Sequence, residues 1–157
     1  MSLTSRELNE FLVQNQIEAE IIFLEEETRT VAEAAAVLGA EPDQIIKSIL
    51  FLADGAPVLV INNGLARVAW KQLADYLGVS RRRLKTAVPE TVLAITGYEV
   101  GAVPRLGIKR HCARWWQRPF TIKPSSMAAA VRFRRLVKLT TAGIKAGGGD
   151  GNGDYKG

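Results

Sequence analysis

Apolar and polar residues follow one another along the first two thirds of the chain with the periods of helices and strands in turn. After the N-cap candidates Thr4 and Ser5, apolar residues at helical spacing predict a first helix that ends near Asn15. Residues 17–24 alternate imperfectly between apolar and polar, which predicts a first strand.

A second helix is predicted over residues 28–38. Thr30 and Glu33, three positions later, form a capping-box pattern, and Gly39 is a typical helix stop. The hydroxyl of Thr30 has two interpretations, a helix cap and a contact to a ligand. They are compatible, because the N-terminus of a helix also attracts anions.

The stretch over residues 45–52 is strand-like and apolar, with one charge in its middle. Period two places Lys47 on one face with three large apolar residues, Ile45, Ile49 and Phe51. An ammonium there is costly unless it is paired or reaches water or a ligand, so Lys47 is the first candidate for a functional residue. The alternative is a lysine whose stem covers apolar surface while its head lies in water.

The same patterns predict the later elements: a tight turn at Asp54-Gly55, a strand over 57–62, and helices over 69–77 and 89–96. Residues 97–107 hold three glycines and a proline, which indicates a loop with special backbone angles. The missing Cβ at Gly101 lets a ligand approach the main chain, whose amides are suited to an oxyanion. The alternative for this loop is a structural connection.

Length and composition favour one soluble domain over residues 1–145 with a flexible, glycine-rich tail over 146–157. No apolar run is long enough to span a bilayer, and the start lacks the features of a secretory signal. We therefore expect a cytoplasmic protein without a membrane partner. The single cysteine, Cys112, adjoins the single histidine, His111, which argues against a zinc site and a Cys–His catalytic pair.

The positive charge is concentrated in the final third. Residues 1–107 hold 10 basic and 14 acidic side chains, whereas residues 108–157 hold 11 and 2. A basic run also occurs at Arg81, Arg82 and Arg83. Its alternatives are a solvated turn and a contact to phosphate.

Three segments together resemble the YbaK / prolyl-tRNA synthetase-associated editing domain family. They are Thr28-Arg29-Thr30-Val31-Ala32-Glu33-Ala34-Ala35 with Leu38-Gly39, Gln44-Ile45-Ile46-Lys47-Ser48-Ile49-Leu50-Phe51, and Thr96-Gly97-Tyr98-Glu99-Val100-Gly101-Ala102-Val103-Pro104. The resemblance covers roughly residues 3–107. It implies an α/β (α+β) fold with a mixed, bifurcated β-sheet and flanking helices.

The resemblance also implies an activity, the hydrolysis of the ester that joins a wrong amino acid to tRNA, typically alanine or cysteine on tRNA for proline. The implied partners are the aminoacylated 3′-end of tRNA and prolyl-tRNA synthetase, and the implied state is a monomer. No cofactor or metal is expected, because an aminoacyl ester is already activated and needs only a positioned nucleophile and donors to the oxyanion.

By resemblance, Lys47 corresponds to the essential lysine of the family, which we expect to hold the 3′-end and stabilise negative charge. The loop that lines the aminoacyl pocket corresponds to Gly101, Ala102, Val103 and Pro104. Thr30 and Ser48 are further candidates for polar groups in the pocket.

The chain departs from the family pattern at Arg105, which stands where the family usually has a second proline. We interpret Arg105 as a contact to tRNA phosphate or as damage to the pocket wall. Residues 108–135 depart further, and two hypotheses account for them: a shifted reading frame, or divergence into a basic, Trp-containing patch for RNA.

Three functions are therefore carried forward. The first is a freestanding aminoacyl-tRNA deacylase, the second a catalytically impaired tRNA-binding module of the same fold, and the third a basic RNA-binding domain.

Overall fold

The computed structural model describes residues 2–25, 27–28, 30–117, 127–132 and 135–139. Its helices are α1 (Ser5–Gln14), α2 (Val31–Leu38), α3 (Trp70–Leu77) and α4 (Pro89–Thr96), with short 3-10 turns η1 (Pro42–Gln44) and η2 (Arg81–Arg83). Its strands are β1 (Ala19–Phe23), β2 (Ile45–Ala53), β3 (Ala56–Asn63), β4 (Leu84–Thr86), β5 (Ala113–Trp116), β6 (Met127–Arg132) and β7 (Arg135–Leu139). Every helix and strand predicted before residue 97 is present. The predicted glycine-rich tail lies outside the described residues.

Side-chain caps and glycines set the helix boundaries. In α2, the Thr30 hydroxyl accepts a hydrogen bond from the Glu33 amide (3.1 Å), and the Glu33 carboxylate accepts one from the Thr30 amide (3.2 Å). The capping box predicted from the sequence is thus confirmed. Gly39 ends the helix with a φ of 62°, a left-handed conformation that favours glycine.

The hairpin of β2 and β3 is the longest pairing in the sheet. Asp54 and Gly55 connect the strands with φ values of 51° and 84°, as a two-residue turn of the primed type requires. The turn sets the register, in which Ala53 lies opposite Ala56 and Lys47 lies opposite Asn62.

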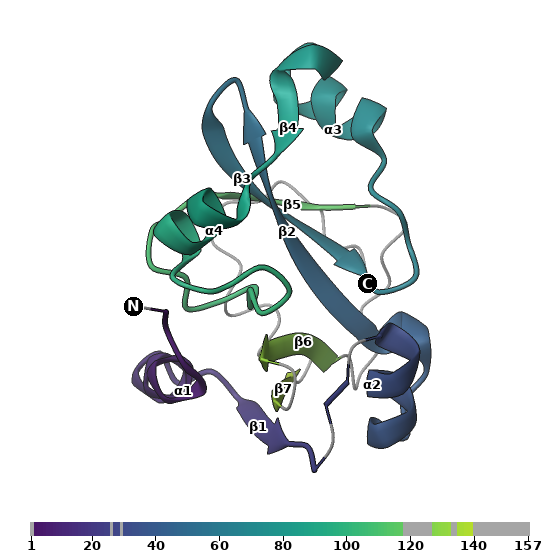
Figure 1. The fold of residues 1–157 in the computed structure, drawn as a ribbon, viewed down its shortest axis with the longest axis vertical. Helices are drawn as coiled ribbons and strands as arrows, with labels where there is room; N and C mark the ends of the chain where they lie inside the picture. The colour runs from purple at the N-terminus through teal and green to yellow at the C-terminus, as the bar shows by residue number, and fades with distance from the viewer. Residues whose placement is uncertain (1, 26, 29, 118–126, 133–134, 140–157) are drawn as a thin grey trace.

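The seven strands of the described residues form one mixed sheet, in the order β1-β7-β6-β2-β3-β5 with β4 also paired to β2 (Figure 1). One edge of β2 is shared by two strands. β6 pairs there with residues 45–46, and β4 pairs with residues 51–53. Residues 47–49 have β3 on one side but no strand of the described chain on the other. We call this interruption the pairing gap, and it confirms the predicted bifurcated sheet.

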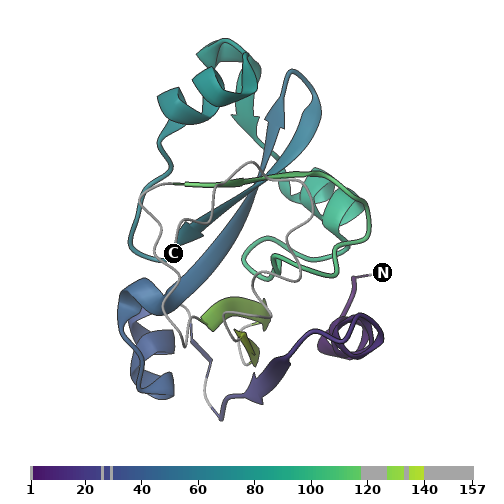
Figure 2. The ribbon, with the colours of Figure 1, turned by 180° about the vertical axis from the view of Figure 1, so that it is seen from behind.

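The two faces of β2 pack against different layers. Ile46 and Leu50 belong to the largest apolar cluster, which also contains residues of α1, α4 and the loop after α4. Ile45 packs in a second cluster with α2, and Phe51 in a third cluster with α3. Figure 2 shows the reverse side, where α2 and α3 lie toward opposite ends of β2. Lys47, between Ile45 and Ile49 on this face, thus lies between the α2 and α3 clusters.

Gly64, directly after β3, packs against the first residue of α2. Its amide donates to the carbonyl oxygen of Ile45 (2.6 Å), and a Cβ at this position would come within 2.5 Å of Val31 Cγ1. The start of α2 therefore packs directly on the backbone beyond β3.

We expect Gly64→Ala to lower the free energy of unfolding by about 1–3 kcal/mol, because the added methyl group overlaps Val31. Urea titration of wild type and variant measures the loss. In a Val31→Ala background the same substitution should cost less, since the two Cγ atoms are absent. An equal loss in both backgrounds would contradict this explanation.

Candidate active site

Lys47 lies on the sheet face between the apolar clusters of α2 and α3. It is half-buried, and its direct cross-strand neighbour is Asn62, whose side chain lies on the same face. Within the described part of the chain, the Lys47 ammonium has no hydrogen-bond or ion-pair partner. The predicted face shared with Ile45, Ile49 and Phe51 is confirmed by the clusters in which these three residues pack. This lysine is the cation closest to the pairing gap along β2.

Two buried amide side chains continue this polar row across the sheet. Asn62 is 1% exposed and Gln117 is 6% exposed. Gln117 follows β5, its amide donates to the Ile61 carbonyl oxygen (3.1 Å), and it therefore continues the parallel pairing next to Asn62. Sequence reasoning missed both residues. Asn62 could have been noticed as a polar residue at the end of an apolar strand. Gln117 lies in residues 108–135, whose sequence pattern did not predict its structure.

The two amides hold the segment between β3 and α3 against this face. Asn62 Nδ2 donates to the carbonyl oxygen of Ala66 (2.9 Å), and Gln117 Nε2 donates to that of Arg67 (2.6 Å). Gln117 Oε1 in turn accepts from the Ala69 amide (2.6 Å). We call residues 64–69 the anchored loop, and it forms one side of the surface around Lys47.

Ser48 faces the pairing gap through its main chain. The carbonyl oxygen of Ile45 accepts from Gly64 on the β3 side, and that of Leu50 accepts from Ala87 on the opposite side. Because main-chain groups alternate along a strand, the N–H and C=O of Ser48 are directed into the gap. They have no ladder partner among the residues that the structure describes. The described part of the chain thus leaves one donor and one acceptor of β2 without a strand partner at this point.

The loop with Gly101 packs on the face opposite Lys47. Val103 joins Ile46 and Leu50 in the largest apolar cluster, and Ala102 and Pro104 are also buried. Gly101 itself is exposed, with a φ of 84°, and a Cβ added there would meet no atom within 4 Å, so its backbone angle explains the glycine better than crowding does. The predicted site residues thus lie on both faces of the sheet: Lys47 on one face, and Ser48 and the loop on the other. β2 at the pairing gap separates the two groups.

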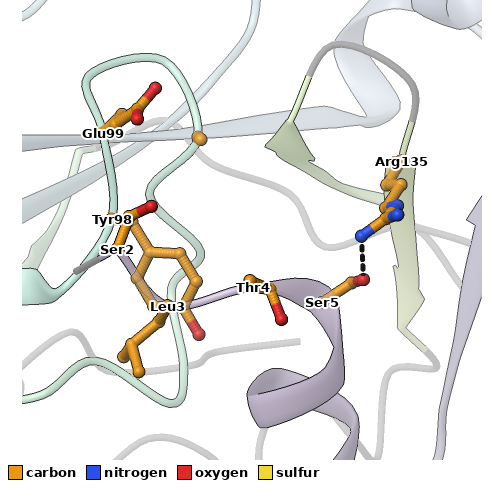
Figure 3. Close-up of a pocket in the computed structure, with 8 residues that line it drawn as sticks. Ser2, Leu3, Thr4, Ser5, Tyr98, Glu99 and Arg135 are labelled. Carbon is orange, nitrogen blue, oxygen red and sulfur yellow. Dashed lines mark hydrogen bonds between the residues drawn. The ribbon is translucent and has the colours of Figure 1, made fainter.

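A small pocket lies beside this loop, at the start of α1 (Figure 3). Of the predicted site residues, Ala102 lines this pocket. Glu99 and Arg135, which were not predicted, line it too. Arg135 Nη1 donates to Ser5 Oγ, and the guanidinium lies 5.2 Å from the centre of the Phe23 ring. The arginine therefore fastens the first turn of α1 to β7. Thr30, by contrast, lies at α2, where its hydroxyl caps the helix.

The three arginines of η2 are exposed but differ in their contacts. Arg81 lies 3.8 Å from the centre of the Trp70 ring and donates to the Leu84 carbonyl oxygen (3.2 Å). Arg83 pairs with Asp54 (3.0 Å). Arg82 is exposed, and no hydrogen bond or ion pair of its side chain to the described residues is found.

Arg105 has a different environment from the one predicted. Its side chain is 1% exposed, and its guanidinium lies 4.9 Å from the centre of the Trp116 ring. The predicted contact to RNA does not fit this position, because the cation is enclosed in the protein instead of lying at the surface. The other interpretation, that Arg105 alters the wall of the loop, agrees with its burial.

The lone thiol is poorly placed for chemistry. Cys112 is 4% exposed, and burial raises the pKa of its thiol, which disfavours the nucleophilic thiolate. Among the residues with a described structure, no group of three His, Cys, Asp or Glu side chains is arranged to hold a metal ion. In the same residues no helix has the length and apolar character needed to cross a membrane.

Comparison with protein families identifies the fold. The family model described as the aminoacyl-tRNA editing domain matches residues 25–140. The chain belongs to this family.

The relatives of this editing domain include parts of larger enzymes. Over 79 residues, which are 50% of this chain, it is 37% identical to the proline–tRNA ligase of Nitratidesulfovibrio vulgaris, of which it covers 13%. Over 102 residues it is 35% identical to the proline–tRNA ligase of Bacillus licheniformis, of which it covers 17%. The editing domain thus spans only a small part of either ligase.

A solved structure matches the editing domain over nearly its whole length. It is described as a proposed trans-editing enzyme for prolyl-tRNA synthetase, and it superposes with a TM-score of 0.85 at 26% identity over 96% of both chains. The resemblance inferred from the three sequence segments is thereby confirmed, and so is the mixed sheet with flanking helices.

Tyr98 allows a test of how the Gly101 loop is packed. Its side chain is 1% exposed, its hydroxyl donates to the Gly107 carbonyl oxygen (3.3 Å), and burial raises its pKa from 10.0 to about 12. The unfolded chain therefore ionises this phenol at a lower pH than the folded chain does. We expect the unfolding free energy to fall as the pH rises from about 10 to about 12.

Denaturant titrations between pH 9 and the upper end of this range test the prediction. Tyr98→Phe should remove the alkaline decline, whereas Tyr76→Phe, at an exposed position on α3, should retain it. The same decline in both variants would assign it to other groups.

Proposed function

We propose that this editing domain is a freestanding aminoacyl-tRNA deacylase that removes alanine or cysteine from tRNA for proline. The observation that carries the proposal is the position of Lys47, half-buried beside the pairing gap and between the apolar clusters of α2 and α3. Family membership and the similarity to proline–tRNA ligases support the substrate class.

In the proposed reaction, a water molecule, positioned by the chain or by a ribose hydroxyl of the substrate, attacks the ester carbonyl carbon and gives up a proton. The carbonyl oxygen gains negative charge, the bond to the ribose oxygen breaks, and that oxygen leaves with a proton. Hydrolysis then yields the free amino acid and tRNA. The chain has to position the ester and stabilise the developing charge, since the ester itself is already reactive.

Three groups suit these tasks. The ammonium of Lys47 holds the 3′-end of the tRNA and neutralises charge. The amide of Ser48, directed into the pairing gap, and the main chain at Gly101 are the available hydrogen-bond donors for the oxyanion. Thr30, Ala102, Val103 and Pro104 remain proposed contacts to the substrate.

The choice between alanine and cysteine depends on the size of the pocket. A small apolar group contributes only about 1–3 kcal/mol to discrimination, so a synthetase that accepts proline cannot fully reject smaller amino acids by binding alone. A separate hydrolytic site removes the resulting errors. We therefore infer that the domain corrects errors of prolyl-tRNA synthetase by recognising aminoacylated tRNA. We further propose that it is cytoplasmic and acts as a monomer.

The second candidate is a module that binds tRNA ends without hydrolysis. The burial of Arg105 against Trp116 favours it, because an enclosed guanidinium occupies space next to the Gly101 loop. The two candidates differ in hydrolysis but share tRNA binding.

We expect Lys47→Ala to lower the rate of Ala-tRNA or Cys-tRNA deacylation by about a hundredfold or more, because it removes the cation that stabilises the oxyanion. Release of radiolabelled amino acid from tRNA for proline measures the rate. Lys71→Ala is the matched control, since Lys71 is an exposed lysine of α3 that pairs with Asp75. Its rate should equal that of wild type.

Lys47→Arg keeps the charge and should retain a measurable part of the activity. If the folded wild type releases neither amino acid, the binding module becomes the better description. If Lys47→Ala retains the wild-type rate, the proposed site is wrong.

Arg81, Arg82 and Arg83 are proposed to contact the phosphate backbone of the tRNA. Arg82→Ala should weaken tRNA binding and reduce the slope of log K against log salt by about 0.7–0.9, the value expected for one lost phosphate contact. Fluorescence anisotropy with labelled tRNA at several salt concentrations gives this slope. An unchanged slope would remove Arg82 from the interface.

A further inference from the structure

The anchored loop is fastened to the sheet more firmly than a simple connection requires. Besides the bonds from Asn62 and Gln117, the Asn63 side chain accepts hydrogen bonds from the amides of Leu65 (3.1 Å) and Ala66 (2.9 Å). Its first residue, Gly64, is bonded to β2 and packed against α2. The loop backbone is therefore held at its beginning, middle and end.

One cation is presented by this loop. Arg67 is exposed, and in the described part of the chain it takes part in no ion pair or cation–π contact. Its carbonyl oxygen is the group bound by Gln117 (2.6 Å), and its neighbour Ala66 is the group bound by Asn62 (2.9 Å). The backbone of Arg67 is thus fixed, whereas its side chain is exposed.

The position of Arg67 relates it to Lys47. Asn62 lies directly opposite Lys47 in the sheet, and its amide reaches the residue before Arg67. Lys47 and the anchored loop consequently border the same face, with Asn62 between them. A lysine and an arginine that border one face of the sheet are suited to bind two successive negative charges.

We propose that Arg67 binds a phosphate of the 3′-terminal nucleotides of the tRNA, and that Asn62 and Gln117 are positioning residues for it. The inference rests on the proposed function for its choice of ligand. A guanidinium presents two parallel donors to a phosphate, which suits it to hold a single-stranded backbone in one orientation. Arg67 then fixes the strand whose last nucleotide carries the ester at Lys47.

The test uses two fluorescein-labelled, unacylated tRNAs for proline, one intact and one without its three terminal nucleotides. Anisotropy titrations give the dissociation constant of each. Wild type should bind the intact tRNA more tightly. Arg67→Ala should weaken binding of the intact tRNA about tenfold, as expected for a lost hydrogen bond to a charged group, and leave binding of the truncated tRNA unchanged.

Two arginine variants serve as comparisons. Arg82→Ala should weaken both tRNAs by the same factor, because its proposed contact is to the body of the tRNA. Arg6→Ala removes an exposed arginine of α1 and should change neither constant. Equal binding of the two tRNAs by wild type, an equal effect of Arg67→Ala on both, or an effect of Arg6→Ala as large as that of Arg67→Ala would each overturn the inference.

A double-mutant cycle tests the positioning role of Gln117. Gln117→Ala should weaken binding of the intact tRNA alone, and it should add nothing in an Arg67→Ala background. Additive effects in the cycle would show that Gln117 acts independently of Arg67. Thermal unfolding of the same samples identifies any general loss of structure.

Hydrolysis is measured separately, so the two proposals can fail independently. Loss of 3′-end preference in Arg67→Ala without any deacylation by wild type supports the phosphate contact and rejects the deacylase. If the wild type deacylates tRNA and Arg67→Ala keeps its preference for the intact 3′-end, the deacylase is supported and the phosphate contact is rejected.

Discussion

The register of β2 against β3 is the constraint on which the site depends. The turn at Asp54-Gly55 sets this register, and it places Lys47 opposite Asn62. A slip of one residue would exchange the two faces of β2. Lys47 would then enter the largest apolar cluster, and Ile46 would lie on the opposite face, between the clusters of α2 and α3. A two-residue turn at the far end of the hairpin therefore decides where the lysine is found.

The sequence could predict what is encoded locally. A capping box and a glycine delimit α2, an Asp-Gly pair marks the hairpin, and period two assigns Lys47 to its face. Each of these signals lies within a few residues of the feature that it specifies. The mixed, bifurcated sheet came from the family resemblance, since pattern alone does not reveal which strands share an edge.

The remainder depends on contacts between distant parts of the chain. Gln117 reaches Asn62 and the anchored loop only because β5 pairs in parallel with β3, an arrangement that no local pattern encodes. A contact of Arg105 to tRNA phosphate was one of two interpretations of the sequence, yet its guanidinium lies 4.9 Å from the centre of the Trp116 ring and is buried. A planar, weakly hydrated cation can be enclosed against an aromatic ring, whereas a sequence pattern records only its charge.

The short length of the pairing gap affects whether strands of other proteins can add to this sheet. Unpaired strand edges usually invite another chain to add a strand, which leads to aggregation. Here the main-chain groups of Ser48, which pair with no described strand on this edge, lie between the ends of β6 and β4, in an interruption of three residues. A strand from another protein needs a longer run of partners to bind stably. An interruption of this length offers too few main-chain partners for an added strand, and its one donor and one acceptor match a small polar group better than a polypeptide.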